Sequence, residues 1–279
     1  MTGRLRGVGA GLAAAVIENR VRAGLEEAPP GGPAAWLRTN HRGEAVSLLE
    51  GPAVAAGMLG GFLTSGEPPR AVVAAGIATA AGAAFGLVDD LAESPEGTRK
   101  GLRGHLGALS RGEVTTGGIK LLGIGSGAIL AAAVGTRRTG SLAGWGADVL
   151  VNGALIASSA NLVNLLDLRP GRAIKASMLG AGVAGLAGAA PGLAGVVVGA
   201  AGAAFEGDLA ERDMLGDGGA NALGAAAGTV VALGAPRGVR LGVLAATVAL
   251  NLVSERVSFT EVIARTPILR ELDAFGRRP

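Results

Sequence analysis

The chain has 279 residues, of which 49% are hydrophobic, 17% are charged and 3% are aromatic, and glycine alone supplies 50 positions. This much glycine without a Gly-X-Y period excludes collagen, and the content of apolar side chains excludes a disordered chain. The absence of cysteine excludes disulfides, zinc–thiolate sites and thiol nucleophiles. The net charge of +3 comes from basic residues between apolar segments, which favours a membrane protein over a nucleic-acid-binding one.

Nine apolar segments follow one another along the chain. The first runs from the basic N-terminus to Ile17 and has no convincing cleavage site, which favours a membrane helix over a signal peptide. The others cover about 52–66, 71–88, 119–136, 142–160, 176–190, 192–206, 219–235 and 239–253. A bilayer core needs about 20 apolar residues, so flanking small residues must extend the shorter segments. We therefore predict an all-α bundle of nine transmembrane helices over 1–253, packed through small residues.

The basic residues predict how this bundle is oriented. Seven of the 25 Lys and Arg lie on the side with short turns, and 18 lie on the side with the long connections. The positive-inside rule places the long connections and the C-terminus in the cytoplasm and the N-terminus outside. An amphipathic cytoplasmic tail over 254–279 either lies along the membrane surface or covers the site. The protein is thus predicted to be a multi-pass protein of the cell membrane, with a homodimer among the open oligomeric states.

Two acidic motifs lie where predicted helices meet the cytoplasmic side. GLVDDL ends one helix with Asp89 and Asp90, and LGDGGAN begins another with Asp217. Ionisable groups near a bilayer are costly and are usually kept for a function. Carboxylates suit Mg²⁺, which also takes oxygens from substrate phosphates, so the motifs predict a magnesium–diphosphate site. A solvated turn for the Asp pair and an N-cap for Asp217 are the alternatives.

A third polar motif, NLVNLLD, closes the segment over 142–160. Its Asn161, Asn164 and Asp167 are three residues apart from one another and share roughly one helix face. Carboxamide and carboxylate oxygens on that face suit the same magnesium–diphosphate site. Hydrogen bonding between helices is the alternative for the two asparagines.

In the order GLVDDL, NLVNLLDLRPG and LGDGGANALG, the motifs resemble those of the polyprenyl-phosphate N-acetylhexosamine-1-phosphate transferases. The resemblance runs from about Gly43 to the C-terminus. It implies Mg²⁺-dependent transfer of a sugar 1-phosphate from a UDP-sugar to polyprenyl (undecaprenyl) phosphate at the cytoplasmic face. It also implies Asp217 and Asp90 as metal ligands, and Asp89, Asp90 and Asp167 as catalytic residues.

Candidate substrate-binding residues lie within or beside these motifs and carry groups that bind phosphate or sugar. They are Asn161, Asn164, Lys100, Arg103, His105 and Arg172. For each Lys and Arg the alternative is that the side chain orients the protein in the membrane and contacts anionic lipid. For His105 the alternative is that the side chain is solvated in a loop.

The chain departs from the family pattern in two places. The family's second motif continues D-G-L-D-G, whereas this chain has Pro170 where the second Asp would lie. Family members in peptidoglycan synthesis carry a P-x-H-H-H run, and the similar stretch over 266–271 has no histidine. Proline can neither bind a metal nor move a proton. These departures motivate an alternative function, a non-catalytic homologue that binds polyprenyl phosphate or a partner membrane enzyme.

Overall fold

The computed structural model describes residues 2–92 and 116–278. In this part of the chain eleven α-helices form nearly all of the regular structure. They are α1 (Thr2–Glu27), α2 (Glu50–Phe62), α3 (Pro69–Ala92), α5 (Thr116–Gly135), α6 (Leu142–Leu166), α7 (Arg172–Leu186), α8 (Pro191–Leu209), α9 (Gly216–Gly234), α10 (Arg237–Ser254), α11 (Phe259–Arg265) and α12 (Pro267–Ala274). The predicted all-α class is confirmed, and each predicted membrane segment overlaps one of the helices from α1 to α10.

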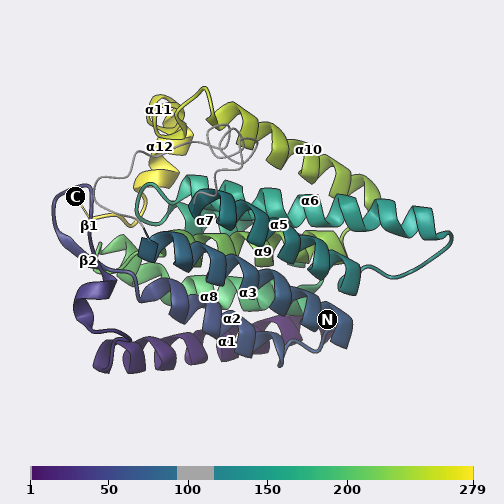
Figure 1. The fold of residues 1–279 in the computed structure, drawn as a ribbon, viewed down its shortest axis with the longest axis horizontal. Helices are drawn as coiled ribbons and strands as arrows, with labels where there is room; N and C mark the ends of the chain where they lie inside the picture. Colours follow the sequence, from purple (N-terminus) through teal and green to yellow (C-terminus); the bar gives the residue numbers. More distant parts are fainter. Residues whose placement is uncertain (1, 93–115, 279) are drawn as a thin grey trace.

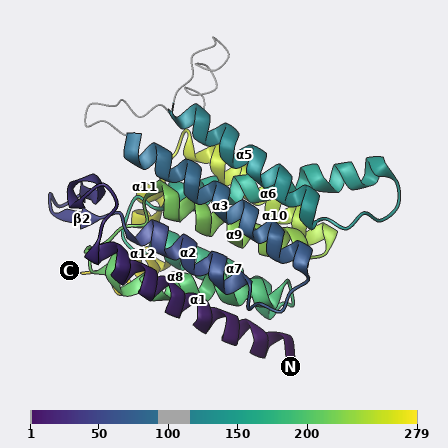
Figure 2. The same cartoon turned by 60° about the horizontal axis from the view of Figure 1, so that its bottom comes forward.

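The helix α9 lies inside the bundle, in contact with α2, α3, α5, α6, α7, α8 and α10 (Figure 1). Of the 19 residues of α9, 14 are buried, because Gly, Ala and Val cover all of its faces. Figure 2 shows α1 along one edge of the bundle, with α5 and α6 toward the other. In both views the first part of α6 projects beyond the neighbouring helices.

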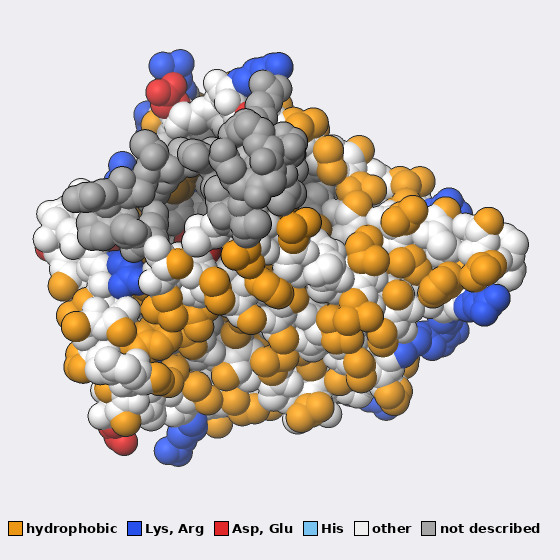
Figure 3. Space-filling model, in the orientation of Figure 1, with side chains coloured by type: hydrophobic (Ala, Val, Ile, Leu, Met, Phe, Trp, Pro, Cys, Tyr) orange, Lys and Arg blue, Asp and Glu red, His pale blue; other side chains and the backbone are white. Residues whose placement is uncertain are grey.

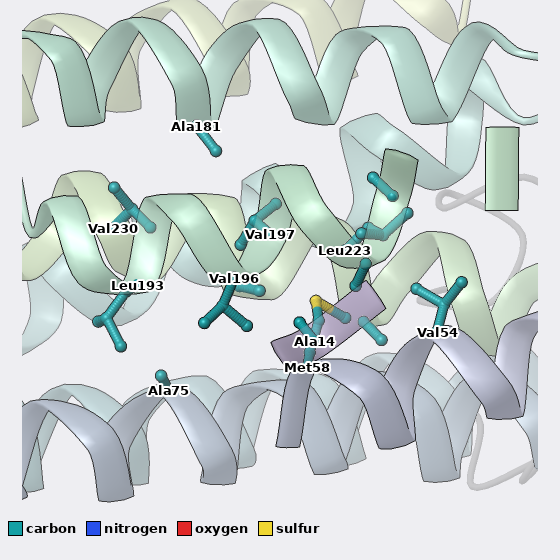
Figure 4. Packing of buried hydrophobic residues seen from close by; sticks show 14 of the residues in the cluster. Ala14, Val54, Met58, Ala75, Ala181, Leu193, Val196, Val197, Leu223 and Val230 are labelled. Atoms are coloured by element: carbon teal, nitrogen blue, oxygen red, sulfur yellow. The ribbon is translucent and has the colours of Figure 1, made fainter. Parts of the chain in front are cut away.

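The core is made of small aliphatic side chains drawn from many helices. Its largest buried cluster joins residues of α1, α2, α3, α6, α7, α8 and α9. Figure 4 shows Ala14, Met58 and Val196, which come from three different helices, close together in this cluster. With so few aromatic residues, close helix contact through Ala and Gly provides most of the packing.

Glycines of α3 bring this helix against the start of α9. A Cβ atom on Gly86 would meet the backbone carbonyl of Asp217, and one on Gly82 would lie 2.7 Å from the carbonyl oxygen of Asn221. Only glycine therefore permits this approach without a shift of the backbone. The consequence is functional, since the contact places the GLVDDL motif beside the LGDGGAN motif.

Five of the described helices, α3, α5, α6, α8 and α10, are long and apolar enough to cross a membrane. Figure 3 shows hydrophobic side chains over much of the visible middle of the bundle, with Lys and Arg at its edges. The helices α2 and α7 have only 13 and 15 residues, and at about 1.5 Å per residue each is shorter than a bilayer core of roughly 30 Å. Nine spans and their orientation stay predictions.

A short hairpin and the tail complete the fold at one end of the bundle. The 3₁₀ helix η1 (Pro33–Trp36) leads into the antiparallel strands β1 (Leu37–Thr39) and β2 (Ala45–Ser47). Ser47 of β2 also pairs with the loop between α8 and α9, at Asp213. The hairpin, this loop and the turn between α6 and α7 therefore surround the same end as the acidic motifs.

Candidate functional site

Three helix ends contribute one ion-pair cluster, which we call the Asp89–Lys120–Asp217 cluster. The ammonium nitrogen of Lys120, near the start of α5, lies 2.7 Å from Asp89 Oδ2. The same nitrogen donates to Asp217 Oδ2 in the first turn of α9. The structure thus brings two of the predicted carboxylates onto one cation.

Asp90 occupies a different position from Asp89. Its Oδ1 accepts a hydrogen bond from the amide of Asp217, and its Oδ2 accepts one from the amide of Gly218, both at 2.9 Å. These amides belong to the first turn of α9, where backbone N–H groups lack helical partners and the helix dipole favours negative charge. Asp90 therefore fixes the end of α3 to the start of α9. Its role as a metal ligand stays a prediction, through the lone pairs that the amides leave free.

The third motif meets the same cluster from the end of α6. Burial raises the pKa of Asp167 well above its ordinary value, and the nearby charges of Asp208, Asp217 and Asp90 raise it further. Asn164, one turn earlier, has a buried Oδ1 atom without a hydrogen-bond partner in the described part of the chain. The three motifs that were identified in the sequence therefore meet at one end of the bundle.

Other predicted site residues make contacts that hold helices together. Asn161 Nδ2 donates to Asn251 Oδ1 of α10 at 2.6 Å, and Asn251 in turn donates to the carbonyl of Ser158 at 2.9 Å. This is the interhelical bonding that was the alternative reading of Asn161. The predicted contact of Asn161 with substrate stays a prediction, because no contact in the described part of the chain bears on it. The predicted residues Lys100, Arg103 and His105 lie outside the described residues.

Arg172 anchors the tail. Its Nε and Nη2 atoms donate to the two carboxylate oxygens of Asp273 at 2.6 and 2.9 Å, and its Nη1 donates to Thr260 Oγ1 at 2.9 Å. Burial alone would raise the pKa of Asp273, but the bonds from Arg172 and the charge of Arg277 hold it below its ordinary value. The tail therefore folds over the turn between α6 and α7, on the end that carries the acidic motifs.

The prediction from sequence missed Lys120 as a site residue. The available signal was a lysine within an apolar helix, at the same end as the acidic motifs. Such a charge is costly beside a bilayer unless it is paired. What the sequence does not specify is the rotation of α5, which decides whether this lysine faces the bundle or the lipid.

The donor set fits a Mg²⁺ ion that keeps most of its ligands as water and phosphate. No group of three or more His, Asp or Glu residues in residues 2–92 and 116–278 is arranged as a complete metal cage. Mg²⁺ does not require one, since it is usually held by one or two carboxylates plus substrate phosphates. Asp89 and Asp217 already share a cation, the Lys120 ammonium, which shows that both carboxylates face one positive charge.

A comparison of the chain with protein-family models gives no match, and a comparison with curated proteins gives none either. The family resemblance therefore depends on the three motifs of this sequence. The structure adds that these motifs, distant in sequence, lie together.

Proposed function

We propose that this protein transfers a sugar 1-phosphate from a UDP-sugar to a polyprenyl phosphate, with Mg²⁺, at the cytoplasmic face of the cell membrane. The observation that carries the proposal is the Asp89–Lys120–Asp217 cluster. It combines carboxylates for a metal with an ammonium for phosphate, at the end of an apolar bundle where a lipid headgroup can reach it. The proposal includes the nine predicted membrane spans. The resemblance of the three motifs to those of the polyprenyl-phosphate N-acetylhexosamine-1-phosphate transferases supports it.

In the proposed reaction, an oxygen of the lipid phosphate attacks the β-phosphorus of the UDP-sugar. A new P–O bond forms there, the bond from the β-phosphorus to the bridging oxygen breaks, and UMP leaves with the electron pair. Bound Mg²⁺ supplies neutralisation of the diphosphate and of the charge that develops on it. Asp217 is the ligand proposed to hold the ion, with Asp90 as its second carboxylate.

The residues of the chain itself would bind and orient the two phosphates. Lys120 can exchange its carboxylate partners for a phosphate oxygen, to which an ammonium binds as a point charge. Asp89, released from Lys120, then orients the lipid phosphate or takes its proton. Asp90 keeps the end of α3 fixed to α9, so that Asp89 and Asp217 stay at a set separation.

A non-catalytic protein that binds polyprenyl phosphate or a partner membrane enzyme is the second candidate. Pro170 motivates it, because the family pattern has an Asp at that position. In such a protein, the ion pairs of Lys120 would be structural, and the carboxylates would hold no catalytic metal.

The deciding experiment is UMP release by the purified full chain with undecaprenyl phosphate, Mg²⁺ and a panel of UDP-sugars. We expect turnover with one of them, lost in Asp217→Asn. Glu206→Gln is the matched control, since its carboxylate lies on α8 with its side chain 88% exposed, and it should keep full turnover. No turnover with every UDP-HexNAc and UDP-MurNAc-peptide would count against the transferase and favour the binding protein.

A further inference from the structure

A strongly basic cavity of about 360 Å³ lies beside the docked tail. The hairpin loop, the turn between α6 and α7, the loop after α8 and the last residues of the chain all contribute to its wall. Its charged and titratable lining residues are His41, Arg42, Arg169, Glu211, Arg277 and Arg278. Four guanidinium groups thus face a single carboxylate, in a volume within the roughly 300–1,000 Å³ of small-ligand pockets.

The one glutamate of this lining is already neutralised. Glu211 is nearly fully buried, and its Oε1 lies 3.1 Å from Arg42 Nε. Its Oε2 accepts a hydrogen bond from Asn40 Nδ2 at 2.8 Å. One carboxylate thus offsets one guanidinium, and although its charge also attracts Arg278, the lining keeps an excess of positive charge.

Two of the other three arginines are held in place by partners at the rim. Arg278 Nη2 lies 2.6 Å from Glu44 Oε1, and Arg277 donates through Nε to the carbonyl of Pro170 at 2.9 Å. Arg277 also donates through Nη2 to Asp273 at 2.8 Å. Each of these contacts uses only some of the five N–H groups of a guanidinium and leaves the others for a ligand.

Arg169 is different, because it has no carboxylate within ion-pair distance in the described part of the chain. It is half-buried, and it lies close enough to Arg277 for their charges to interact. Burial, together with the charges of Arg172 and Arg169, holds the pKa of Arg277 below its ordinary value. Positive charge in this cavity is thus in excess of what the protein itself compensates.

We infer that this cavity is an anion site that binds a phosphate group, with Arg169 as its uncompensated ligand and Arg277 and Arg278 of the tail completing it. Guanidinium groups bind phosphate oxygens through paired N–H donors, which makes phosphate the class of anion that the lining fits best. None of these residues belongs to the Asp89–Lys120–Asp217 cluster. The inference therefore holds whether or not the chain turns over a UDP-sugar.

The phosphate has two chemical sources, a soluble diphosphate and the headgroup of an anionic lipid. Titration calorimetry of the full chain in phosphatidylcholine nanodiscs, with inorganic pyrophosphate and with UDP, tests the first. We expect Arg169→Gln to weaken binding about tenfold or more, as the loss of one charged hydrogen-bonding partner does, and Arg169→Lys to restore part of it. Arg212→Gln removes a charge from the neighbouring loop, where the side chain is 58% exposed and lies outside the lining, and should leave the affinity unchanged.

The second source is tested in nanodiscs that contain phosphatidylglycerol, by native mass spectrometry of the lipid that the protein retains. Retention that falls in Arg169→Gln but not in Arg212→Gln supports the site and assigns it to a headgroup. The inference is overturned if Arg169→Gln matches the wild type in both assays, or if Arg212→Gln loses as much as Arg169→Gln. Because both readouts are binding, a failure of the proposed reaction leaves them interpretable.

Discussion

Replacing Lys120 by methionine removes the ammonium that pairs with both Asp89 and Asp217 while keeping much of the side-chain length. At 2.7 Å, a pair of unit charges interacts by ~6 kcal/mol with an effective dielectric constant of about 20, before the cost of desolvation is subtracted. Breaking a fully buried pair costs about 3–5 kcal/mol. The side chains here keep 18%, 20% and 31% exposure, so water recovers part of this. We therefore expect a loss of about 2–3 kcal/mol.

Thermal unfolding of the full chain in detergent, followed by circular dichroism, measures this loss. A change of this size lowers the Tm of a domain of this length by roughly 5–10 °C. Mg²⁺ should restore part of the Tm in Lys120→Met, because a divalent cation held by Asp217 offsets the repulsion between the two carboxylates that have lost the ammonium. Lys120→Arg keeps the charge and is the conservative variant, and Arg212→Met is the control for loss of an exposed charge, expected within about 0.5 kcal/mol.

Two results would refute this reasoning. A Tm of Lys120→Met equal to that of the wild type would mean that the ion pairs contribute no net stability. A lowered Tm that Mg²⁺ leaves unchanged, while Lys120→Arg is normal, would mean that Asp217 does not bind the ion. The first result concerns the geometry, and the second concerns the proposed metal.

Three further predictions use other parts of the same end. Asp217→Asn should lower turnover, and higher Mg²⁺ should partly restore it, because this variant loses a proposed metal ligand. Asp89→Asn should lower turnover in a way that Mg²⁺ does not restore. Identical Mg²⁺ dependence of both variants in UMP-release assays would contradict these roles. Gly86→Ala should lower the free energy of unfolding by about 1–3 kcal/mol through its clash with α9, while Gly125→Ala, with open space around its Cβ position, should be neutral or stabilising in the same melts. Because the pKa of Asp273 is lowered in the folded chain, its ion pair with Arg172 stabilises tail docking fully above the ordinary value of 3.8 and is lost as the pH falls through the lowered value. The protection of α12 against hydrogen exchange should therefore fall only in that acid range. A loss of this protection already at neutral pH would contradict the prediction.

The helices were predictable from sequence because long apolar runs separated by proline, glycine and arginine leave little choice of secondary structure. The meeting of Asp89, Asp167 and Asp217 at one end was predictable as well, since the nine predicted segments alternate in direction. The same pattern of apolar runs does not determine whether each helix crosses the bilayer. The helices α2 and α7 are short, and α1 contains several charged residues. These three helices are therefore not among the five that are long and apolar enough to cross a membrane.

The specific contacts of the site depend on packing, which hydropathy does not encode. Lys120 reaches Asp217 across 97 residues of sequence, and Arg172 reaches Asp273 across 101. The Lys120 pair requires one rotation of α5 about its axis, and Gly123 and Gly127 favour that rotation, because a Cβ atom on either would meet Phe85 or Ala81 of α3. The motif pattern therefore located the residues, while the glycine contacts decided which of their atoms meet.

Two clusters of opposite charge share this end of the bundle, and they are joined through one turn of the chain. Asp167, beside the acidic cluster, precedes Arg169, in the wall of the basic cavity, by two residues. A free phosphate is attracted by the arginines and repelled by the carboxylates, whereas a cation is affected in the opposite sense. A ligand that carries both a diphosphate and a divalent ion satisfies the two clusters together. The separation of charge thus favours a diphosphate that carries a divalent ion over a cation or a phosphate alone.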